Sequence, residues 1–337
     1  MSGKGIAPLR AAIVGCGYIG KRRAANLAGA RLVACADLDV DRARALAADA
    51  PGCVATSDWR EVIIRDDVDF VVVATLHDAL AEITGAAVAA GKHVLVEKPA
   101  ARNADELKSV AELARKTGAL VRVGFNHRCH QSFRRARQLV DEGALGPLMF
   151  ARARYGHGGR IGYDREWRAD PAKSGGGELI DQGVHLIDLS RWFLGDFSQV
   201  SGNARTFYWD MPVDDNAFLL LTTAEGRVAF LHASCTEWKN TFSYELYGRD
   251  GKLTVEGLGG SYGTERLTWY HMLPQMGPPE TMAWEYPMAD NSWLVEMQDF
   301  QEDIRLGHQP NPGLADAMAV LSIVSTIYKE SGYDYRP

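Results

Sequence analysis

An apolar strand pattern, a glycine-rich turn, a helix and a second strand follow one another between residues 9 and 37. The first strand pattern, 9–14, runs into Gly15-Cys16-Gly17-Tyr18-Ile19-Gly20, and the second, 31–36, ends at Asp37. Glycines in a G-x-G-x-x-G turn permit a tight bend and close approach of backbone to a pyrophosphate, and the following helix N-terminus supplies aligned N–H donors. This order of elements predicts a βαβ unit that binds a dinucleotide.

The acid at the end of the second strand bears on which dinucleotide is bound. Asp37 lies 22 positions after Gly15, where a carboxylate accepts hydrogen bonds from the adenosine ribose and repels a 2′-phosphate. Asp37 therefore favours NAD over NADP. The alternative to a dinucleotide site as a whole is a glycine turn that only packs a helix against a strand. The expected cofactor contacts here are Gly15, Gly17, Tyr18, Ile19, Gly20 and Asp37.

Strands and helices continue to alternate as far as residue 126. Helical patterns at 41–49, 57–65, 78–90 and 103–117 are interleaved with apolar strand patterns at 69–74, 94–96 and 119–123. We expect six strands in all, joined by right-handed crossovers into a doubly wound parallel sheet. Residues 1–126 are thus predicted to form a Rossmann domain of the α/β class.

A lysine follows one of these strands. Val94-Leu95-Val96 is continued by Glu97-Lys98-Pro99, which places an acid and an amine at the carboxyl edge of the sheet. Ligands of open α/β folds bind at that edge, so Lys98 is a candidate functional residue. The alternative is a surface lysine in a loop.

The pattern changes after Asn126. A helix at 132–142 and a strand at 148–155 precede a β-rich region from 197 to 270, and helices are expected at 292–306 and 313–330. This composition of elements predicts an α+β domain over 127–337 with a large, mostly antiparallel open sheet. The helices within 292–330 are expected to pack back toward the first domain.

A second candidate site lies in a predicted helix over 178–193. Asp181, His185 and Asp188 are spaced i, i+4 and i+7 and would share one helical face. A carboxylate at Asp181 could orient the His185 imidazole as a general base, although a purely structural Asp–His pair fits the same spacing. The run Gly175-Gly176-Gly177 favours a site, because it leaves room for a ligand beside the backbone.

Arginine and aromatic residues are frequent in the segment 152–168, which precedes that helix. Arginine forks bind carboxylates and phosphates, and aromatic rings stack on sugars, so an anionic sugar is one possible ligand. Ordinary pairing with Asp164, Glu166 and Asp170 is the alternative. The candidate substrate contacts are Arg128, Arg154, Tyr163, Trp167 and Arg168, together with Lys98, Asp181 and His185. His127, Cys129 and His130 lack a fourth ligand, so no metal is expected.

Taken together, these motifs resemble the Gfo/Idh/MocA oxidoreductase family, named for glucose–fructose oxidoreductase, inositol dehydrogenase and a rhizopine-catabolism protein. The resemblance rests on the glycine fingerprint, on Glu97-Lys98-Pro99, and on the glycine run followed by Asp181 and His185. It implies hydride transfer between NAD and a hydroxyl-bearing carbon of a sugar, cyclitol or nucleotide-sugar. It also implies an open sheet that forms the interface of a homodimer or homotetramer.

Roles for individual residues follow from the same resemblance. Lys98 would touch the nicotinamide ribose and the substrate hydroxyl, Glu97 would help to position Lys98, and Asp181 would orient His185 as the base. Members differ in whether histidine, lysine or tyrosine is the base. The fourth strand departs from the usual Thr-Pro-Asn continuation, because Thr75-Leu76-His77 follows it and Leu80 stands where many relatives have histidine. Thr75 and His77 are nevertheless expected near the cofactor.

Composition narrows the classes of function that remain. The net charge of −6 and the pI near 5.9 argue against nucleic acid or an anionic membrane as the main partner. No signal-peptide or membrane-spanning pattern is seen, and five scattered cysteines suggest neither disulfides nor a metal finger, so a cytoplasmic protein is expected. Two alternatives to a dehydrogenase stay open: a redox-neutral NAD-dependent glycosidase and a non-catalytic NAD-binding regulator.

Overall fold

The computed structural model describes residues 7–333 and 335, and these form two compact units. The first unit contains the described residues up to Gly124 together with Trp293–Met318. The second contains Phe125–Ser292 and the described residues from Ala319 onward. The chain therefore returns to the first unit after completing most of the second, and it ends in the second.

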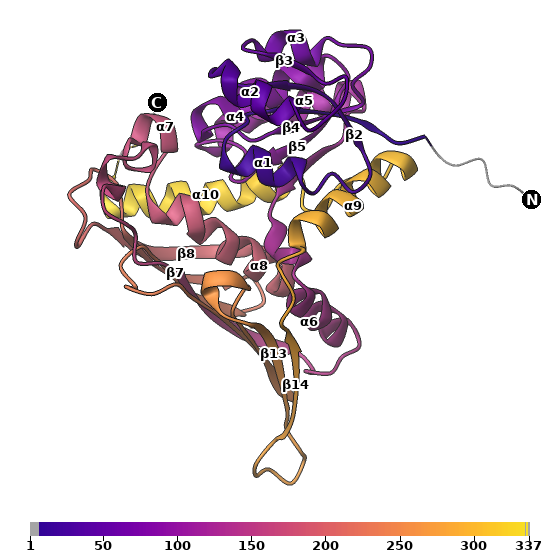
Figure 1. Cartoon of the computed structure of the whole chain (residues 1–337). Helices are drawn as coiled ribbons and strands as arrows, with labels where there is room; N and C mark the ends of the chain where they lie inside the picture. Colours follow the sequence, from indigo (N-terminus) through magenta and orange to yellow (C-terminus); the bar gives the residue numbers. More distant parts are fainter. Residues whose placement is uncertain (1–6, 334, 336–337) are drawn as a thin grey trace, which may run out of the picture. The chain divides into compact units, whose positions relative to one another are not determined.

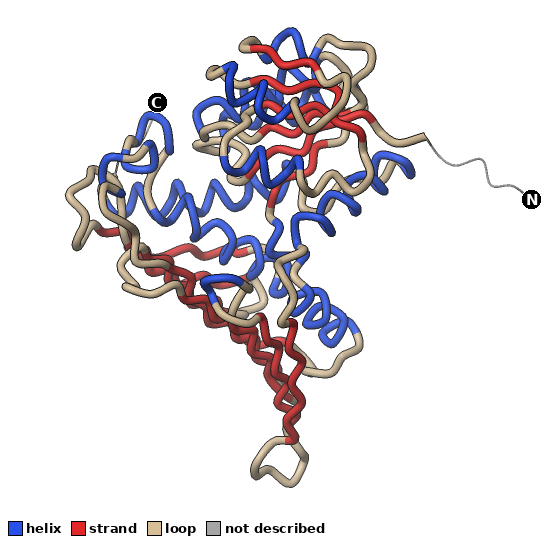
Figure 2. Tube along the Cα trace, viewed as in Figure 1, coloured by secondary structure: helices blue, strands red, loops and turns tan. Residues whose placement is uncertain are grey.

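A parallel six-stranded sheet with helices on both faces makes up most of the first unit (Figures 1 and 2). Its strand order is β3-β2-β1-β4-β5-β6, the doubly wound order in which the direction of winding reverses between β1 and β4. The predicted Rossmann fold is confirmed. Its strands are β1 (Arg10–Val14), β2 (Arg31–Ala36), β3 (Val54–Thr56), β4 (Phe70–Val73), β5 (His93–Glu97) and β6 (Val121–Gly124).

The local sequence explains where the helices of this unit begin. Asn103 precedes α5, and its side chain accepts hydrogen bonds from the backbone N–H groups of Asp105 and Glu106. Asp39 and Asp58 cap α2 and α3 in the same way, which satisfies N–H groups that lack an intrahelical partner. The helices are α1 (Tyr18–Ala24), α2 (Val40–Ala47), α3 (Trp59–Ile63), α4 (His77–Ala89), α5 (Ala104–Thr117) and α9 (Ser292–Leu306).

The sequence pattern indicated two features of the first unit only in outline, namely a third strand without a position and a late helix without its contacts. Strand β3 has only three residues, none of them buried, so it lacks the apolar run that marks the other strands. Helix α9 supplies Met297 and Phe300 to the same buried core as Phe70, with the Phe70 and Phe300 rings meeting edge to face at 5.7 Å. Its residues thus complete a core begun nearly 300 positions earlier.

The second unit is built on an eight-stranded sheet of order β14-β13-β12-β11-β7-β10-β9-β8. Strands β7 and β10 are parallel, and all other described neighbours are antiparallel, which confirms the predicted mostly antiparallel open sheet. The strands are β7 (Leu148–Gly156), β8 (Phe197–Arg205), β9 (Asn216–Thr223), β10 (Val228–Ser234), β11 (Thr241–Gly248), β12 (Gly251–Glu256), β13 (Glu265–His271) and β14 (Glu280–Tyr286).

One face of this sheet carries the helices of the unit, and side-chain alternation along β7 shows which face that is. Ala151, Ala153 and Tyr155 are buried, whereas Arg152 and Arg154 are exposed. Helix α8 (Val184–Leu194) packs against β7 and β10 and lies along the sheet in Figure 1. The remaining helical elements are α6 (Gln131–Asp141), α7 (Pro171–Ser174), α10 (Leu314–Ser331) and 3-10 turns at Asn126–Cys129, Tyr163–Arg165, Trp167–Ala169 and Gly260–Tyr262.

Among the described residues, none of the helices is both long and apolar enough to cross a bilayer. All five cysteines are free thiols. The Sγ atoms of Cys35 and Cys53 lie 3.9 Å apart, well beyond the length of a disulfide bond.

Candidate active site

The glycine-rich turn between β1 and α1 uses its three glycines for different reasons. Gly15 has φ +93°, and a Cβ there would lie 2.4 Å from the carbonyl oxygen of Ala74. A Cβ on Gly20 would lie 1.9 Å from the carbonyl oxygen of Gly15. Gly17, in contrast, has φ −71°, and a Cβ would meet nothing within 4 Å. Neither backbone conformation nor packing requires glycine at Gly17, which fits a position kept bare for a pyrophosphate.

Alanine at two of these positions should separate folding from cofactor binding. Gly20→Ala is expected to destabilise the protein by about 3 kcal/mol, because backbone must move to relieve the clash. Gly17→Ala should leave the free energy of unfolding within about 0.5 kcal/mol. It should nevertheless weaken NAD binding at least about tenfold, or ~1.4 kcal/mol. Urea unfolding and NADH fluorescence titration measure the two effects; unchanged NADH affinity in Gly17→Ala would contradict this account of the turn.

Asp37 is tied to the same turn. Its Oδ2 accepts a hydrogen bond from the backbone N–H of Cys16 at 2.7 Å, and its Oδ1 accepts one from the N–H of Asp39 at 2.9 Å. The carboxylate therefore stands at the end of β2 in a fixed orientation. Leu38, which follows it, is 92% exposed and was not singled out from the sequence. Tyr18, one of the predicted cofactor contacts, is 77% exposed at the start of α1.

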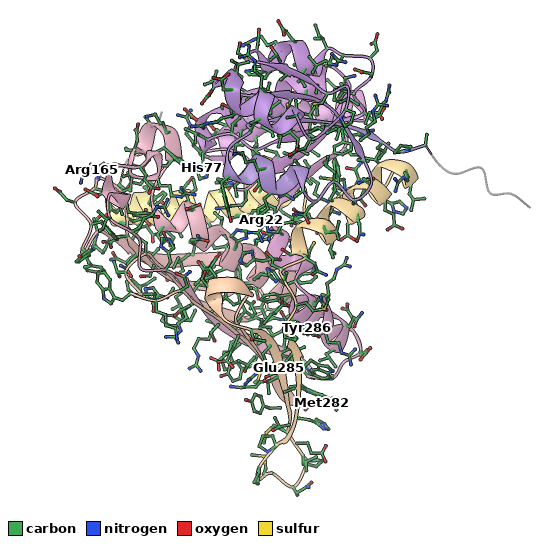
Figure 3. The ribbon with its side chains drawn as sticks, in the orientation of Figure 1. Arg22, His77, Arg165, Met282, Glu285 and Tyr286 are labelled. Atoms are coloured by element: carbon green, nitrogen blue, oxygen red, sulfur yellow. The ribbon has the colours of Figure 1, made fainter. Side chains whose placement is uncertain are left out.

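The predicted contacts after the fourth strand lie next to this turn in the sheet. Strand β4 is the neighbour of β1, and Gly15 packs against the Ala74–Thr75 backbone. His77 begins α4 and is buried; Figure 3 labels it at that end of the helix. The ends of β1 and β4, where the winding reverses, thus bring Thr75 toward the glycine turn.

Lys98 stands in a tight turn at the carboxyl end of β5. The backbone N–H of Ala100 donates to the carbonyl of Glu97 at 2.9 Å, and Ala100 has φ +74°, a strained value for a residue other than glycine. Lys98 is half-buried, and the side chain of Glu97 is held by Arg23, whose Nε donates to Oε1 at 2.6 Å. Strained backbone two residues after a lysine at the carboxyl edge of the sheet marks this turn as a candidate functional position.

The candidate residues of the second unit lie on a helix that is not regular. Residues Leu179–Gly183 form a π-helical turn that leads directly into α8. The predicted helix over 178–193 is therefore present, but its first turn is wider than an α-helical turn, and Asp181 lies in that turn while His185 lies in α8. Such π turns frequently occur at functional sites.

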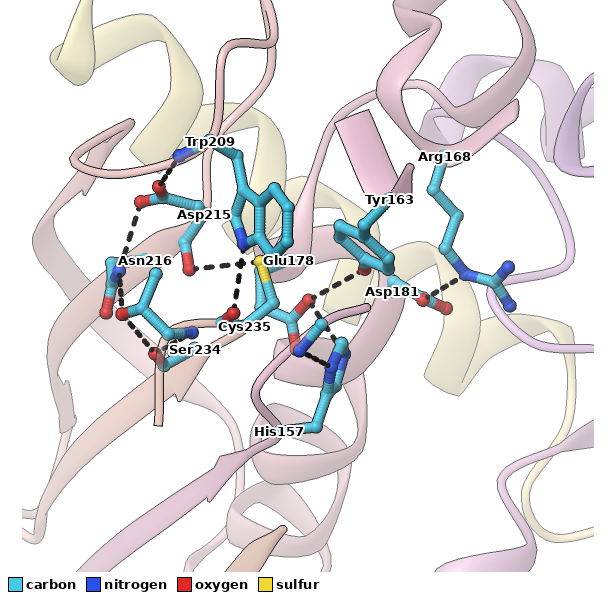
Figure 4. Close-up of polar contacts among 12 residues, drawn as sticks. His157, Tyr163, Arg168, Glu178, Asp181, Trp209, Asp215, Asn216, Ser234 and Cys235 are labelled. Atoms are coloured by element: carbon cyan, nitrogen blue, oxygen red, sulfur yellow. Dashed lines mark hydrogen bonds and ion pairs between the residues drawn. The ribbon is translucent and has the colours of Figure 1, made fainter. Parts of the chain in front are cut away.

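Arginines from other segments pair with the two aspartates. Arg168 Nε donates to Asp181 Oδ2 at 2.8 Å, as Figure 4 shows. Arg128, itself buried, forms a two-bond fork with Asp188 at 2.7 and 2.6 Å. The negative charge of Asp181 raises the pKa of the Arg168 guanidinium further. Arg128 thus forms a buried ion pair with Asp188 of α8, whereas Arg168 pairs with Asp181 within the π turn.

The imidazole of His185 is enclosed by aromatic rings. It stacks on His127 at a centroid distance of 3.8 Å and meets Phe125 and Tyr155 edge to face at 6.0 and 6.2 Å. His185 is 3% exposed, so packing of the surrounding rings fixes the orientation of its imidazole. A base held in one orientation needs no reordering before proton transfer.

A polar network beside Asp181 was not anticipated from the sequence. Buried Glu178 faces His157, with 3.6 Å between Oε2 and Nε2, and it accepts a 3.5 Å hydrogen bond from the Tyr163 hydroxyl (Figure 4). Burial alone would lower the pKa of His157, but the hydrogen bond and charge of Glu178 leave that pKa raised. Glu178 and His157 lie in different segments of the sequence, so no local pattern indicates that they pair. The spacing of Glu178 and Asp181 shows only that two acids lie close together.

At Gly176 and Gly177, the glycine run before the π turn does not leave room for a ligand, contrary to the expectation. A Cβ on Gly177 would lie 1.9 Å from the carbonyl oxygen of Asp214, and one on Gly176 would lie 2.2 Å from the hydroxyl oxygen of Tyr328. The two oxygens of the Asp214 carboxylate accept hydrogen bonds from Gly177 and Leu179 N–H at 2.8 Å each. The space is filled by the protein itself, which anchors the start of the π turn.

The arginine-rich segment does not converge on one place. Arg154 is exposed on the sheet face opposite to Tyr155, so the structure does not bring it to the other candidates. Arg160 pairs with Glu166, and Arg165, with its side chain 82% exposed, lies at the edge of its loop (Figure 3). The Arg168 guanidinium lies 4.6 Å from the centre of the Trp167 ring. Among the predicted residues, Arg168 contacts both Trp167 and Asp181, and Tyr163 contacts Glu178, which precedes the π turn.

Over the part of the chain that the structure describes, no three His, Cys, Asp or Glu side chains are grouped to hold a metal ion. His127 stacks on His185, and His130 Nδ1 lies 2.9 Å from Glu265 Oε2.

Comparisons with known proteins match both units. Residues 9–125 match the family model described as "Oxidoreductase family, NAD-binding Rossmann fold", and residues 133–254 match the "GFO/IDH/MocA C-terminal domain". An inositol 2-dehydrogenase of Gluconacetobacter diazotrophicus is 32% identical over 89% of this chain and 87% of its own length. The scyllo-inositol 2-dehydrogenase (NAD(+)) of Bacillus subtilis is 28% identical over 90% of this chain and 88% of its own.

A solved structure agrees with the fold. Levoglucosan dehydrogenase, in complex with NADH and levoglucosan, superposes with a TM-score of 0.87 at 24% identity, covering 97% of this chain and 98% of that one. The glycine turn, the Glu97-Lys98-Pro99 sequence and the helix bearing Asp181 and His185 occur within the matched family regions. The chain therefore belongs to the Gfo/Idh/MocA family of oxidoreductases, with an NAD-binding Rossmann domain.

Proposed function

We propose that this protein is an NAD-dependent dehydrogenase that oxidises a secondary hydroxyl of a neutral sugar or cyclitol, or reduces the corresponding ketone. One observation carries the proposal: Lys98 lies in a strained turn at the carboxyl end of β5. In the sheet, β5 is next to β4, and β4 is next to β1, which leads into the glycine turn. An amine at the carboxyl edge of a dinucleotide-binding sheet, on the strand next to β4, suits a role in chemistry at the cofactor.

The roles of the residues follow from what each can donate or accept. Bound NAD supplies the nicotinamide ring that takes up hydride from the substrate carbon. His185 is proposed to accept the hydroxyl proton, since imidazole is the side chain best suited to this near neutral pH. Lys98 is proposed to donate to the oxygen on which negative charge develops. Asp181, oriented by Arg168, is proposed to set the hydrogen bonding around His185 and the substrate.

A neutral substrate is favoured by how the arginines are used. Arg168 is paired with Asp181, and Arg160 with Glu166. Because each cation already has an acidic partner, an anionic group would have to displace a carboxylate. Neutral hydroxyls can instead donate to Asp181 and accept from Arg168, and Trp167 can lie against a sugar ring. Tyr163 is proposed as a further substrate contact.

A spectrophotometric screen tests this proposal. Purified protein is given NAD with neutral sugars, cyclitols, sugar acids and nucleotide-sugars in parallel, and NADH formation is followed. NADH formation with neutral polyols supports the proposal; a strict requirement for an acid or nucleotide would contradict the neutral class. If no compound yields NADH but glycosides release aglycone, the redox-neutral glycosidase is supported. If the protein binds NAD without turnover of either kind, the regulator is supported.

Asp37 is proposed to select NAD by accepting hydrogen bonds from the adenosine ribose, with Leu38 packed against the adenine. Asp37→Ala should raise the KM for NAD by about 10–100-fold, because hydrogen bonds to a charged group contribute about 1.5–3 kcal/mol. The KM for NADP should change less, because the repelling charge is gone. Asp39→Ala is the matched control: it removes the cap of α2 and should leave the NAD-to-NADP ratio unchanged. An unaltered ratio in Asp37→Ala would refute the assignment.

The open face of the eight-stranded sheet is proposed to join copies of the chain into a homodimer or homotetramer. Large apolar side chains on it are partly exposed, including Phe218 at 36%, Leu220 at 48% and Phe230 at 48%. Adjacent apolar groups of this size are typical of an interface. Light scattering across a range of concentrations should show a mass at least twice 36.9 kDa, and a monomer throughout would refute the proposal.

A further inference from the structure

Three buried charged side chains meet behind Lys98 in the first unit. Arg23 of α1 is fully buried, and its guanidinium contacts Glu97 on one side and Glu296 of α9 on the other. The Nη2 to Glu97 Oε1 distance is 2.5 Å, and the Nη1 to Glu296 Oε2 distance is also 2.5 Å. A single cation therefore bridges two carboxylates from segments about 200 residues apart in the sequence.

The surrounding residues leave this group no freedom to rearrange. The Trp293 ring lies over the Arg23 guanidinium, with 4.3 Å between the ring centre and Cζ. Gly124 ends β6 beside it, where an added Cβ would come within 2.9 Å of Arg23 Nη2 and 3.2 Å of Glu97 Oε2. The Arg23 guanidinium and the Glu97 carboxylate are thus confined by close packing as well as by charge.

This arrangement is a poor way to gain stability alone. The desolvation free energy of buried charged groups offsets much of the free energy gained from their attraction. Well-packed apolar residues often stabilise a core as well or better. Glu296 is fully buried, and its Oε1 has no hydrogen-bond partner among the described residues. Burial raises the pKa of Glu296 even against the opposing charge of Arg23. A role other than stability accounts better for three charges at this depth.

We propose that Arg23 and Glu296 are positioning residues for Lys98, acting through Glu97. The Glu97 side chain is anchored by Arg23, and its carbonyl closes the turn that carries Lys98 by accepting from Ala100 N–H at 2.9 Å. Glu296 fixes the guanidinium from the far side, so α9 of the C-terminal region defines where the lysine turn lies. This inference rests on the proposed dehydrogenase function, in which Lys98 donates to the reacting oxygen.

The test uses the full-length protein with two substitutions and one control. Glu296→Gln keeps the shape of the side chain and removes its charge, and Arg23→Lys keeps the charge and loses the two-sided fork. Asp303→Asn is the matched control, because Asp303 also lies on α9 and pairs with Arg122 at 2.7 Å without touching Glu97. The concentration of NADH-binding sites is measured by fluorescence titration, and kcat is calculated per site. A variant that is partly unfolded therefore does not give a falsely low kcat.

Both substitutions are expected to lower kcat by about 10–100-fold, as displacement of a catalytic group by a fraction of an ångström does. The NADH dissociation constant should stay within about threefold, a change of less than ~1 kcal/mol. Asp303→Asn should retain the wild-type kcat. A lower melting temperature with unchanged kcat per NADH site in Glu296→Gln and Arg23→Lys would overturn the inference, because it would show a purely structural role.

A second readout keeps this inference separate from the proposed function. The rate at which an amine-reactive ester acylates Lys98 is measured by peptide mass spectrometry, with exposed Lys116 of α5 as the internal reference. Displacement of the turn should change the Lys98 rate in Glu296→Gln and Arg23→Lys but not in Asp303→Asn. This difference in Lys98 acylation rate is expected even if the wild type oxidises no sugar. Absence of sugar oxidation would refute only the proposed dehydrogenase function. Identical Lys98 rates in all variants would overturn the positioning role.

Discussion

Replacing Lys98 by methionine is expected to lower kcat for the substrate found in the screen by about 10³-fold. Methionine keeps most of the volume of the side chain, so the half-buried position stays filled while the ammonium is lost. The missing group is a donor aimed at the oxygen that becomes negative as hydride leaves, and such donors act mainly on the transition state. NADH affinity should change far less than kcat.

The comparison that makes this result interpretable is Lys116→Met. Lys116 is exposed on α5 and pairs only with Glu112 of the same helix among the contacts described for it, so its loss should leave kcat and melting temperature unchanged. Wild-type kcat in Lys98→Met would refute the assigned role. A parallel loss of NADH binding and thermal stability would instead make Lys98 a structural residue of its turn.

Replacing His185 by asparagine is expected to lower kcat by about 10²–10³-fold. The asparagine amide can still form hydrogen bonds at the π turn, but it cannot take up the hydroxyl proton. Because a base must be deprotonated to act, wild-type kcat should rise with pH as the base loses its proton. In His185→Asn this rise should disappear, and the residual rate should increase with hydroxide instead.

The matched control for His185 is His308→Asn, which alters an exposed histidine in the loop after α9. It should reproduce both the wild-type rate and the wild-type pH profile. If His185→Asn kept the pH-dependent rise at a lower rate, His185 would be a positioning residue and another group would be the base. Lys98 and a tyrosine are the candidates that the family resemblance names for that role.

The double His185→Asn, Lys98→Met variant adds a check on both assignments. If both residues act on the same proton transfer, their losses should not add, because each substitution already disables the step that the other assists. Full additivity of the two losses in free energy would indicate that they serve separate steps.

Local patterns in the sequence predicted the first unit well, because its features depend on neighbours in the chain. A buried parallel strand is a run of apolar residues, a glycine turn is a fixed spacing, and a cap is a polar side chain placed before a helix. The glycine fingerprint, Asp37 and the lysine turn were found in this way. Strand β3 was counted among the six expected strands but was not located, because none of its three residues is buried.

The candidate site of the second unit was predicted by residue but not by partner. Asp181 and His185 were identified as candidates, but the π turn at Leu179–Gly183 was not anticipated, because long-range contacts with Asp214 and Tyr328 anchor the residues that lead into it. Arg154 was assigned to the substrate from its neighbours in sequence, although strand alternation turns it to the opposite sheet face. Sequence proximity is a poor guide where a strand separates two faces.

The sequence by itself thus indicated the fold class, the cofactor and the family, and it singled out Lys98 and His185 as candidates, because each of these depends on short spacings along the chain. Only the tertiary structure decided which charges meet: Arg168 with Asp181, Arg128 with Asp188, and Arg23 with Glu97 and Glu296. Such pairs join residues that are up to 273 positions apart, and no local pattern encodes which of many acids a buried arginine will reach.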